Sequence, residues 1–144
     1  MNTSFFIAKV SNDSECGMLI AICDELGLAT ESKTYEGLTE RVWEIAPEIA
    51  AENGIDISIE TIISFQQNQT AKDRGSMLCK GSSVYPKLRT ILHENGCMFV
   101  RHGKYSHAIW AYPPFDKYFT VPVTIISRVL ANAILEQADV KQNI

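Results

Sequence analysis

Hydrophobic residues in the first half of the chain gather in short runs that predict β-strands. The runs FFIAKV (5–10) and CGMLIAIC (16–23) are separated by a polar, turn-forming gap, which is typical of a β-hairpin. The segment DELGLAT (24–30) turns at its glycine and predicts a short third strand. Residues 55–65 alternate between hydrophobic and polar positions and predict a last strand, with a short helix from Ser58 as the alternative.

Between these strands, hydrophobic residues recur with the period of an α-helix. Thr34 is suited to cap the N-terminus of this helix, and Asn53 and Gly54 predict its end. Pro47 is expected to kink the helix or to start a new one. The hydrophobic face consists of Leu38, Val42, Ile45 and Ile49. The first half is therefore predicted to be a small antiparallel β-sheet covered by one helix.

The second half predicts a helix, three antiparallel strands and a second helix. Ser82 or Ser83 is suited to cap a helix that starts near Val84 and carries Pro86 in its first turn. The predicted strands are 97–101, 104–112 and 117–121. Thr124 is expected to cap the last helix. Its buried face is expected to comprise Ile126, Val129, Leu130, Ala133, Ile134 and Gln137. Double-stranded-RNA-binding domains share this order of elements.

A polar stretch, residues 66–83, separates the two halves and shows no hydrophobic periodicity. We expect an α+β protein with domains at residues 1–70 and 82–144, joined by a linker at residues 71–81. Within the linker, Gly75-Ser76-Met77 has the form of a cloning junction followed by a second start methionine. The sequence leaves open whether the fusion of the two halves is natural or engineered.

Charge is distributed unevenly along the chain. Up to Arg74 there are five basic and thirteen acidic residues, a net charge of −8, and after it eight basic and four acidic residues, a net charge of +4. This asymmetry indicates a polyanion-binding surface on the second half, which the acidic half is able to cover, although chance variation between two domains is the alternative. On the predicted first helix, glutamates lie four residues apart at Glu36, Glu40, Glu44, Glu48 and Glu52. They form either a solvated face or an anionic surface that imitates a phosphate backbone.

Composition narrows the class of protein. The chain has 144 residues, of which 46% are hydrophobic, as in globular domains. No hydrophobic run approaches the ~18 residues that a membrane span needs. The N-terminus reaches Lys9 without the hydrophobic core of a signal peptide, so a cytoplasmic location is expected. The cysteines lack metal-ligand spacing and are expected to be reduced, mostly buried thiols: Cys16, Cys23, Cys79 and Cys97. We expect neither a metal nor a cofactor.

The second half carries a Gly-Lys-x-Ser-His turn and strand at residues 103–107, a Val-Pro pair at 121–122 and an Ile-Leu-x-Gln-Ala ending at 134–138. With these motifs, residues 84–140 resemble the HicA-type toxins of bacterial toxin–antitoxin pairs. The matching positions are Gly96, Phe99, Arg101, Gly103, Lys104, Ser106, His107, Trp110, Val121, Pro122, Ile134, Leu135, Gln137 and Ala138. The resemblance implies a ribonuclease that cleaves messenger RNA without a metal. One position departs from the family, because Tyr105 stands where glycine is usual, and this puts the local backbone and the activity in question.

The first half carries its own set of characteristic positions: Gly27, Leu28, Thr30, Glu31, Leu38, Val42, Pro47, Glu48, Asn53 and Gly54. By these residues it resembles the short HicB-like antitoxins that are encoded beside such toxins, with a partial RNase H-like fold. The resemblance implies that residues 1–70 bind and mask the toxin half, either within a chain or between chains. It also implies that the protein forms homo-oligomers.

His107 is the predicted catalytic residue, because an imidazole can exchange a proton with the 2′-hydroxyl of RNA at cellular pH. On a strand, Tyr105, His107 and Ile109 would share one face, and Ser106, Ala108 and Trp110 would share the other. The alternative for His107 is a half-buried structural histidine. His102 is a weaker candidate for a second proton-transfer group. The predicted RNA contacts are Arg101, Lys104, Ser106 and Lys117, and exposed strand-edge charge is the alternative for the cations. Core packing is expected for Trp110 and Phe119, with base stacking as the alternative.

These observations predict a messenger-RNA endoribonuclease that is inhibited in the full-length chain by its acidic first half. The first alternative is a non-catalytic RNA-binding module with an acidic regulatory domain. The second alternative is a pure interaction protein whose halves pack by charge and contact no nucleic acid.

Overall fold

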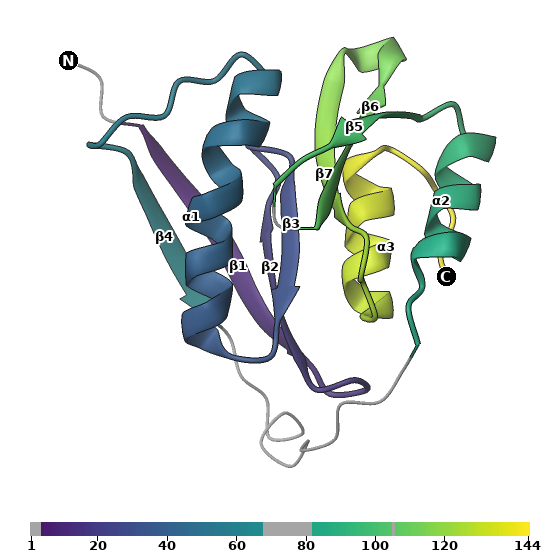
Figure 1. The fold of residues 1–144 in the computed structure, drawn as a ribbon, viewed down its shortest axis with the longest axis horizontal. Coiled ribbons are helices and arrows are strands. Elements are labelled where there is room, and N and C mark those ends of the chain that lie inside the picture. Colours follow the sequence, from purple (N-terminus) through teal and green to yellow (C-terminus); the bar gives the residue numbers. More distant parts are fainter. Residues whose placement is uncertain (1–3, 68–81, 105) are drawn as a thin grey trace.

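The computed structural model describes residues 4–67, 82–104 and 106–144 and shows a mixed α+β protein (Figure 1). A four-stranded sheet with one helix forms the N-terminal unit (residues 4–67), and a three-stranded sheet with two helices forms the C-terminal unit (residues 82–144). The predicted linker, Cys79 and Tyr105 lie outside the described residues. The predicted α+β class is therefore confirmed.

The N-terminal sheet has the strand order β3-β2-β1-β4. The hairpin of β1 (Phe5–Asp13) and β2 (Met18–Cys23) and the third strand β3 (Leu28–Ser32) are as predicted. The last strand, β4 (Ile62–Gln67), pairs parallel with β1, so the sheet is mixed rather than antiparallel throughout. Parallel strands need a long crossover, and the helix between β3 and β4 supplies it.

The helix α1 (Tyr35–Glu52) begins as predicted, because the Gly37 amide donates to the Thr34 hydroxyl at 3.0 Å. Its hydrophobic face is buried against the sheet. The helix continues through Pro47, so no second helix starts there. It ends at Asn53, and Gly54 follows with a φ of +69°.

The strand predicted at residues 55–65 begins only at Ile62. A turn precedes it, in which the Ser58 amide donates to the Thr61 hydroxyl at 2.9 Å. This side-chain hydrogen bond offers the backbone an alternative to the sheet ladder. The helix that was the alternative from Ser58 is not formed.

The C-terminal unit follows the predicted order. It consists of α2 (Tyr85–Glu94), β5 (Met98–His102), β6 (His107–Tyr112), β7 (Lys117–Pro122) and α3 (Arg128–Gln137). The strands form an antiparallel meander in the order β5-β6-β7. The helices α2 and α3 lie together on one side of this sheet (Figure 1).

Three boundaries in the C-terminal unit differ from the prediction. The second strand starts at His107 rather than at residue 104, because Ser106 has a φ of +63° and lies in a turn. The helix α2 has Val84 at its cap position, while the Ser83 hydroxyl accepts from the Tyr85 amide at 3.2 Å. The predicted cap at Thr124 is wrong, because Ser127 caps α3 by accepting from the Leu130 amide at 3.0 Å.

The later start of α3 also changes which residues face inward. Val129 was expected to be buried, but it is 50% exposed. The buried positions of α3 are Leu130, Ala131, Ile134, Leu135 and Gln137.

The hydrophobic cores of the two units interlock. Ile109 of β6 packs into the core of the N-terminal unit, while Ile20 and Ala29 pack into the core of the C-terminal unit. The expected core packing of Trp110 and Phe119 is confirmed, since neither side chain is exposed. Among the described residues, Cys16, Cys23 and Cys97 are buried free thiols. Burial raises the pKa of Cys16 and of Cys97 to about 11, so both are neutral at cellular pH.

Candidate nucleic-acid site and the interface that covers it

The two units meet where β3 lies against β7 (Figure 1). The Ala29 amide donates to the Thr120 hydroxyl at 3.1 Å, and the Thr120 amide donates to the Gly27 carbonyl at 2.9 Å. Asn53 binds the backbone of Tyr118 twice, accepting from its amide at 2.9 Å and donating to its carbonyl at 2.9 Å. The interface is therefore held by specific polar contacts as well as by the interlocked cores.

Gly27 allows a close approach between two backbones in this interface. Its φ is +74°, and a Cβ atom at this position would lie 2.3 Å from the Tyr118 carbonyl oxygen. A side chain of any size would collide with the backbone of β7 and would also be strained at this φ. The position therefore requires glycine as long as the units are docked.

His107 lies in the interface between the units. The residue is 1% exposed, and its Nε2 atom lies 3.0 Å from the Thr30 hydroxyl of β3. Ala108 and Trp110 pack into the core of the C-terminal unit, whereas Ile109 packs into that of the N-terminal unit. The predicted alternation of faces is thus confirmed, and His107 faces outward from its own unit. The N-terminal unit is what covers the ring.

The C-terminal end of α1 contacts two further predicted site residues, which stay partly exposed to solvent. The Arg101 guanidinium contacts Glu48 at 3.3 Å and Glu52 at 2.5 Å, and the hydrogen bond to Glu52 raises the pKa of Arg101. The Lys104 amide donates to Glu48 at 3.0 Å. The Glu48 carboxylate thus accepts from a guanidinium and a backbone amide, the two kinds of donor that hold a phosphate.

The glutamates of α1 divide between the two interpretations that the sequence allowed. Glu36, Glu40 and Glu44 are exposed and form a solvated face. Glu48 and Glu52 are half-buried against the C-terminal unit, and both contact the Arg101 guanidinium.

The remaining predicted site residues lie away from His107 or at its margin. Ser106 is exposed in the turn before β6, and its carbonyl accepts from the Val123 amide at 2.9 Å. Pro122 is the partner of His107 in β7, and Lys117 stands five residues earlier, about 17 Å along the strand. His102 pairs with Ala108 and therefore lies on the opposite face of the sheet from His107. The structure thus groups Arg101, Lys104 and His107, but neither Lys117 nor His102 with them.

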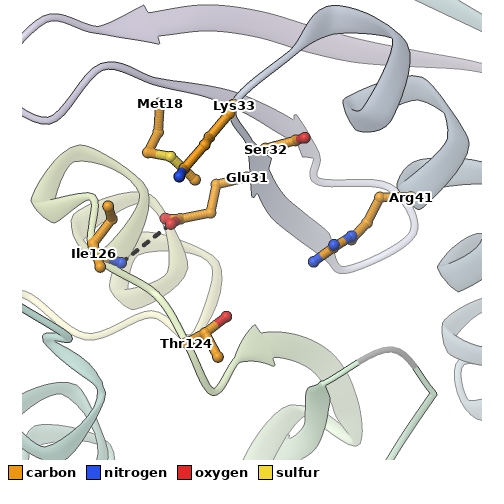
Figure 2. Close-up of a pocket in the computed structure, with 7 residues that line it drawn as sticks. All are labelled: Met18, Glu31, Ser32, Lys33, Arg41, Thr124 and Ile126. Carbon is orange, nitrogen blue, oxygen red and sulfur yellow. Dashed lines mark hydrogen bonds between the residues drawn. The ribbon is translucent and has the colours of Figure 1, made fainter. Parts of the chain in front are cut away.

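A second cluster of interface contacts surrounds the N-terminus of α3. The Glu31 carboxylate accepts from the amides of Ile126 and Ser127, each at 3.2 Å, and the Ser127 hydroxyl donates to Asp13 at 2.6 Å. Figure 2 shows Glu31 at the wall of a cavity of about 390 Å³ between the units. The cavity is lined by Met18, Glu31, Ser32, Lys33, Arg41, Thr124 and Ile126.

Sequence reasoning missed that Glu31, Asn53 and Gln137 hold the units together. The Gln137 amide group donates to Asp24 at 2.9 Å and to the Leu28 carbonyl at 3.2 Å. All three residues are among the positions that carry the family resemblances, which was the signal available. Their roles depend on contacts across the interface and have no local sequence pattern.

We expect the Glu31→Gln variant to change the pH dependence of stability. Burial raises the pKa of Glu31 above its ordinary value of 4.5, so its contribution to stability is fully present below pH 4.5 and is lost as the pH rises through the raised pKa. The free energy of unfolding of the parent should therefore fall relative to that of Glu31→Gln, by no more than about 1.4 kcal/mol per pH unit. Urea unfolding of both proteins between pH 4 and 8 measures this difference.

The exposed Glu40→Gln variant is the matched control and should follow the parent at every pH. Parallel stability profiles for Glu31→Gln and the parent would contradict a raised pKa for Glu31.

Within residues 4–67, 82–104 and 106–144, no group of three or more His, Cys, Asp and Glu side chains is arranged to hold a metal ion. None of the helices in this part of the chain has the length and hydrophobicity of a membrane span.

Comparison with known proteins identifies the N-terminal unit. A family model described as a domain of unknown function, DUF1902, matches residues 5–76. This match covers the four-stranded sheet and α1. No curated protein and no solved structure matches the chain. The family match spans half of the 144 residues, and the chain belongs to the DUF1902 family.

Proposed function

We propose that the C-terminal unit is a HicA-type endoribonuclease that cleaves messenger RNA, and that the N-terminal unit is a HicB-like antitoxin that inhibits it within the same chain. The resemblance of the two sequence halves to these families motivates the proposal. Its activity would be metal-independent, and its place of action would be the cytoplasm, where messenger RNA is found. We also propose that copies of the chain associate into homo-oligomers, as expected for HicB-like antitoxins.

One observation carries this proposal: the N-terminal unit contacts His107, Arg101 and Lys104 together, and His107 is buried in the docked chain. Thr30 contacts the imidazole, and Glu48 contacts both the Arg101 guanidinium and the Lys104 amide. A purely structural histidine would be expected in the core of its own unit, yet His107 lies on the face that the other unit covers. An inhibitor that occupies an active site would make contacts of this kind.

The chemistry follows from the groups on this face. The His107 imidazole takes the proton of an RNA 2′-hydroxyl, and the 2′-oxygen attacks the adjacent phosphorus. The bond from phosphorus to the 5′-oxygen breaks, and that oxygen takes a proton from solvent. Arg101 and the Lys104 amide would then hold the phosphate oxygens that Glu48 replaces in the inhibited chain.

A non-catalytic RNA-binding module is the second candidate. The placement of His102 favours it, because the two histidines lie on opposite faces of the sheet and cannot share one reaction. This candidate predicts that RNA binds to the same face with a steep salt dependence but is not cut.

Incubation of RNA with residues 78–144 alone distinguishes the candidates. The C-terminal unit is expected to fold alone, because its own residues make up most of its core, to which the other unit adds Ile20 and Ala29, with Ile22 packed against it. Residues 78–144 should degrade RNA on a gel, the full-length chain should not, and residues 1–74 added in trans should restore inhibition. RNA that is retained but intact would support the second candidate, and the absence of both binding and cleavage would support a pure interaction protein.

A further inference from the structure

The C-terminal unit has a second concave surface, between α2 and β5, that none of the described contacts between the units involves. It is a cavity of about 400 Å³, within the range of about 300–1,000 Å³ that is common for small-molecule sites. Its lining residues are Tyr85, Arg89, His93, Phe99 and His102. We call it the aromatic pocket.

An irregularity in β5 creates this pocket. Phe99 pairs with Trp110 of β6, but the register then shifts, so that Arg101 pairs with Ile109 and His102 with Ala108. In a regular strand Phe99 and Arg101 would share a face. The bulge instead directs Phe99 and His102 toward α2, and Arg101 toward α1 of the N-terminal unit. The strand β5 therefore contributes Arg101 to the face that carries His107, and Phe99 and His102 to the aromatic pocket.

The pocket combines aromatic rings with a cation. The Phe99 and His102 ring centroids are 5.1 Å apart, and the Arg89 guanidinium lies 5.9 Å from the centroid of the Tyr85 ring. Aromatic side chains that stack bases, together with a guanidinium that pairs with phosphate, are the usual means by which proteins bind unpaired RNA. The net charge of +4 on this half of the sequence suits such a ligand.

A buried polar group beside the pocket has no hydrogen-bond partner among the described residues. Trp110 is fully buried, and its Nε1 atom is unpaired within this part of the chain. The Trp110 ring contacts two lining residues, His93 at 4.9 Å and Phe99 at 5.9 Å between centroids. A buried indole N–H without a partner is uncommon, and the contacts of its ring make this group sensitive to what occupies the aromatic pocket.

The aromatic pocket stays accessible when the N-terminal unit covers His107. The helix α2 lies on the far side of the C-terminal unit from α1 (Figure 1). All five lining residues belong to the C-terminal unit, and Arg89, His93 and His102 are exposed in the docked chain.

We propose that the aromatic pocket binds one unpaired nucleotide of an RNA strand, with the base against Phe99 and the phosphate on Arg89, in the full-length inhibited chain. The inference rests on the proposed function for the choice of RNA as the ligand. It goes beyond that function because it gives the inhibited protein an RNA-binding site of its own, separate from the face that carries His107.

The test measures binding of a fluorescent six-nucleotide unpaired RNA to the full-length chain. Phe99→Ala should weaken binding roughly 5- to 100-fold, which is the range for loss of one base–aromatic stack. Phe115→Ala removes an aromatic ring that is 63% exposed in the 3-10 turn Pro113–Phe115 (η2), outside the pocket, and should bind like the parent. Equal affinities for both variants and the parent would overturn the proposal.

A second pair of variants keeps the test independent of packing around Phe99. Arg89→Gln should weaken binding and reduce its salt dependence, whereas Lys87→Gln, on the same helix but outside the lining, should have a much smaller effect. A duplex RNA of the same sequence should compete poorly, because its bases are not available for stacking. Equal losses for Arg89→Gln and Lys87→Gln would reduce the pocket to a general electrostatic surface and overturn the proposal.

The two tryptophans supply a direct readout of the site. Of the two indole N–H signals, that of Trp110 should shift when the RNA is added, and that of Trp43, which is 40% exposed on α1, should not. The signals are assigned with Trp43→Phe. A Trp110 signal that does not move at saturating RNA would contradict RNA binding in the aromatic pocket.

Failure of this inference and failure of the proposed function give different results. If residues 78–144 cleave RNA but the full-length chain binds it without dependence on Phe99, only the aromatic pocket is refuted. If Phe99-dependent binding occurs and residues 78–144 do not cleave, the pocket is supported and the ribonuclease proposal fails.

Discussion

Replacement of His107 by alanine in residues 78–144 should lower the rate of RNA cleavage by at least about 100-fold, the usual minimum for loss of a general base. The variant retains Arg101 and Lys104 and should still bind RNA. The physical reason is that no other imidazole lies on the same face of the described part of the sheet, since His102 belongs to the opposite face. Initial rates with a fluorescent RNA substrate measure the effect, and binding is measured separately on the same protein.

His102→Ala is the matched control for this experiment. It removes an imidazole from the same sheet and should retain most of the parent's cleavage rate at saturating RNA, because its ring packs beside Phe99 rather than beside His107. Cleavage by His107→Ala at the parent's rate would refute the catalytic assignment and leave RNA binding as the function of this face.

The second large effect is expected from Gly27→Ala in the full-length chain. A methyl group there would lie 2.3 Å from the Tyr118 carbonyl oxygen, so β3 has to move away from β7. This movement breaks the hydrogen bond from the Thr120 amide to the Gly27 carbonyl. A loss of about 1.4 kcal/mol in the free energy of docking increases the open fraction about tenfold. We therefore expect the full-length variant to cleave RNA at least about ten times faster than the full-length parent.

Gly54→Ala separates this effect from backbone strain. Gly54 has a φ of +69°, close to that of Gly27, but a methyl group added at Gly54 would meet no atom of the described residues within 4 Å. Both variants carry the strain of alanine at positive φ, and only Gly27→Ala disturbs the interface. Equal cleavage rates for the two full-length variants would show that docking at β3 and β7 does not control access to His107.

Local sequence signals predicted the helix α1 well. Thr34 caps it through a hydrogen bond to Gly37 within the same turn, and Gly54 ends it through its own positive φ. The start of α3 could not be found in this way. Ser127 is fixed at the cap position by the carboxylates of Asp13 and Glu31, which come from the other unit. A contact between residues more than 90 positions apart leaves no trace in a local pattern.

The candidate site was predictable to a similar extent. The period of two along a strand placed His107 and Ile109 on one face, and the structure agrees. The distant position of Lys117 follows from the pairing register of β7, and the separation of Arg101 from Phe99 and His102 follows from a bulge. Register and bulges are set by pairing between strands, so the sequence of one strand does not reveal them.

The docking of β3 against β7 occurs within a single polypeptide. Each round of translation therefore delivers one copy of the covering unit with each copy of the covered one, and their stoichiometry is fixed. Under the proposed function, the inhibitor could not be degraded separately from the ribonuclease. Activation would then require reversible opening at Gly27 and Tyr118, or scission of the backbone between the units.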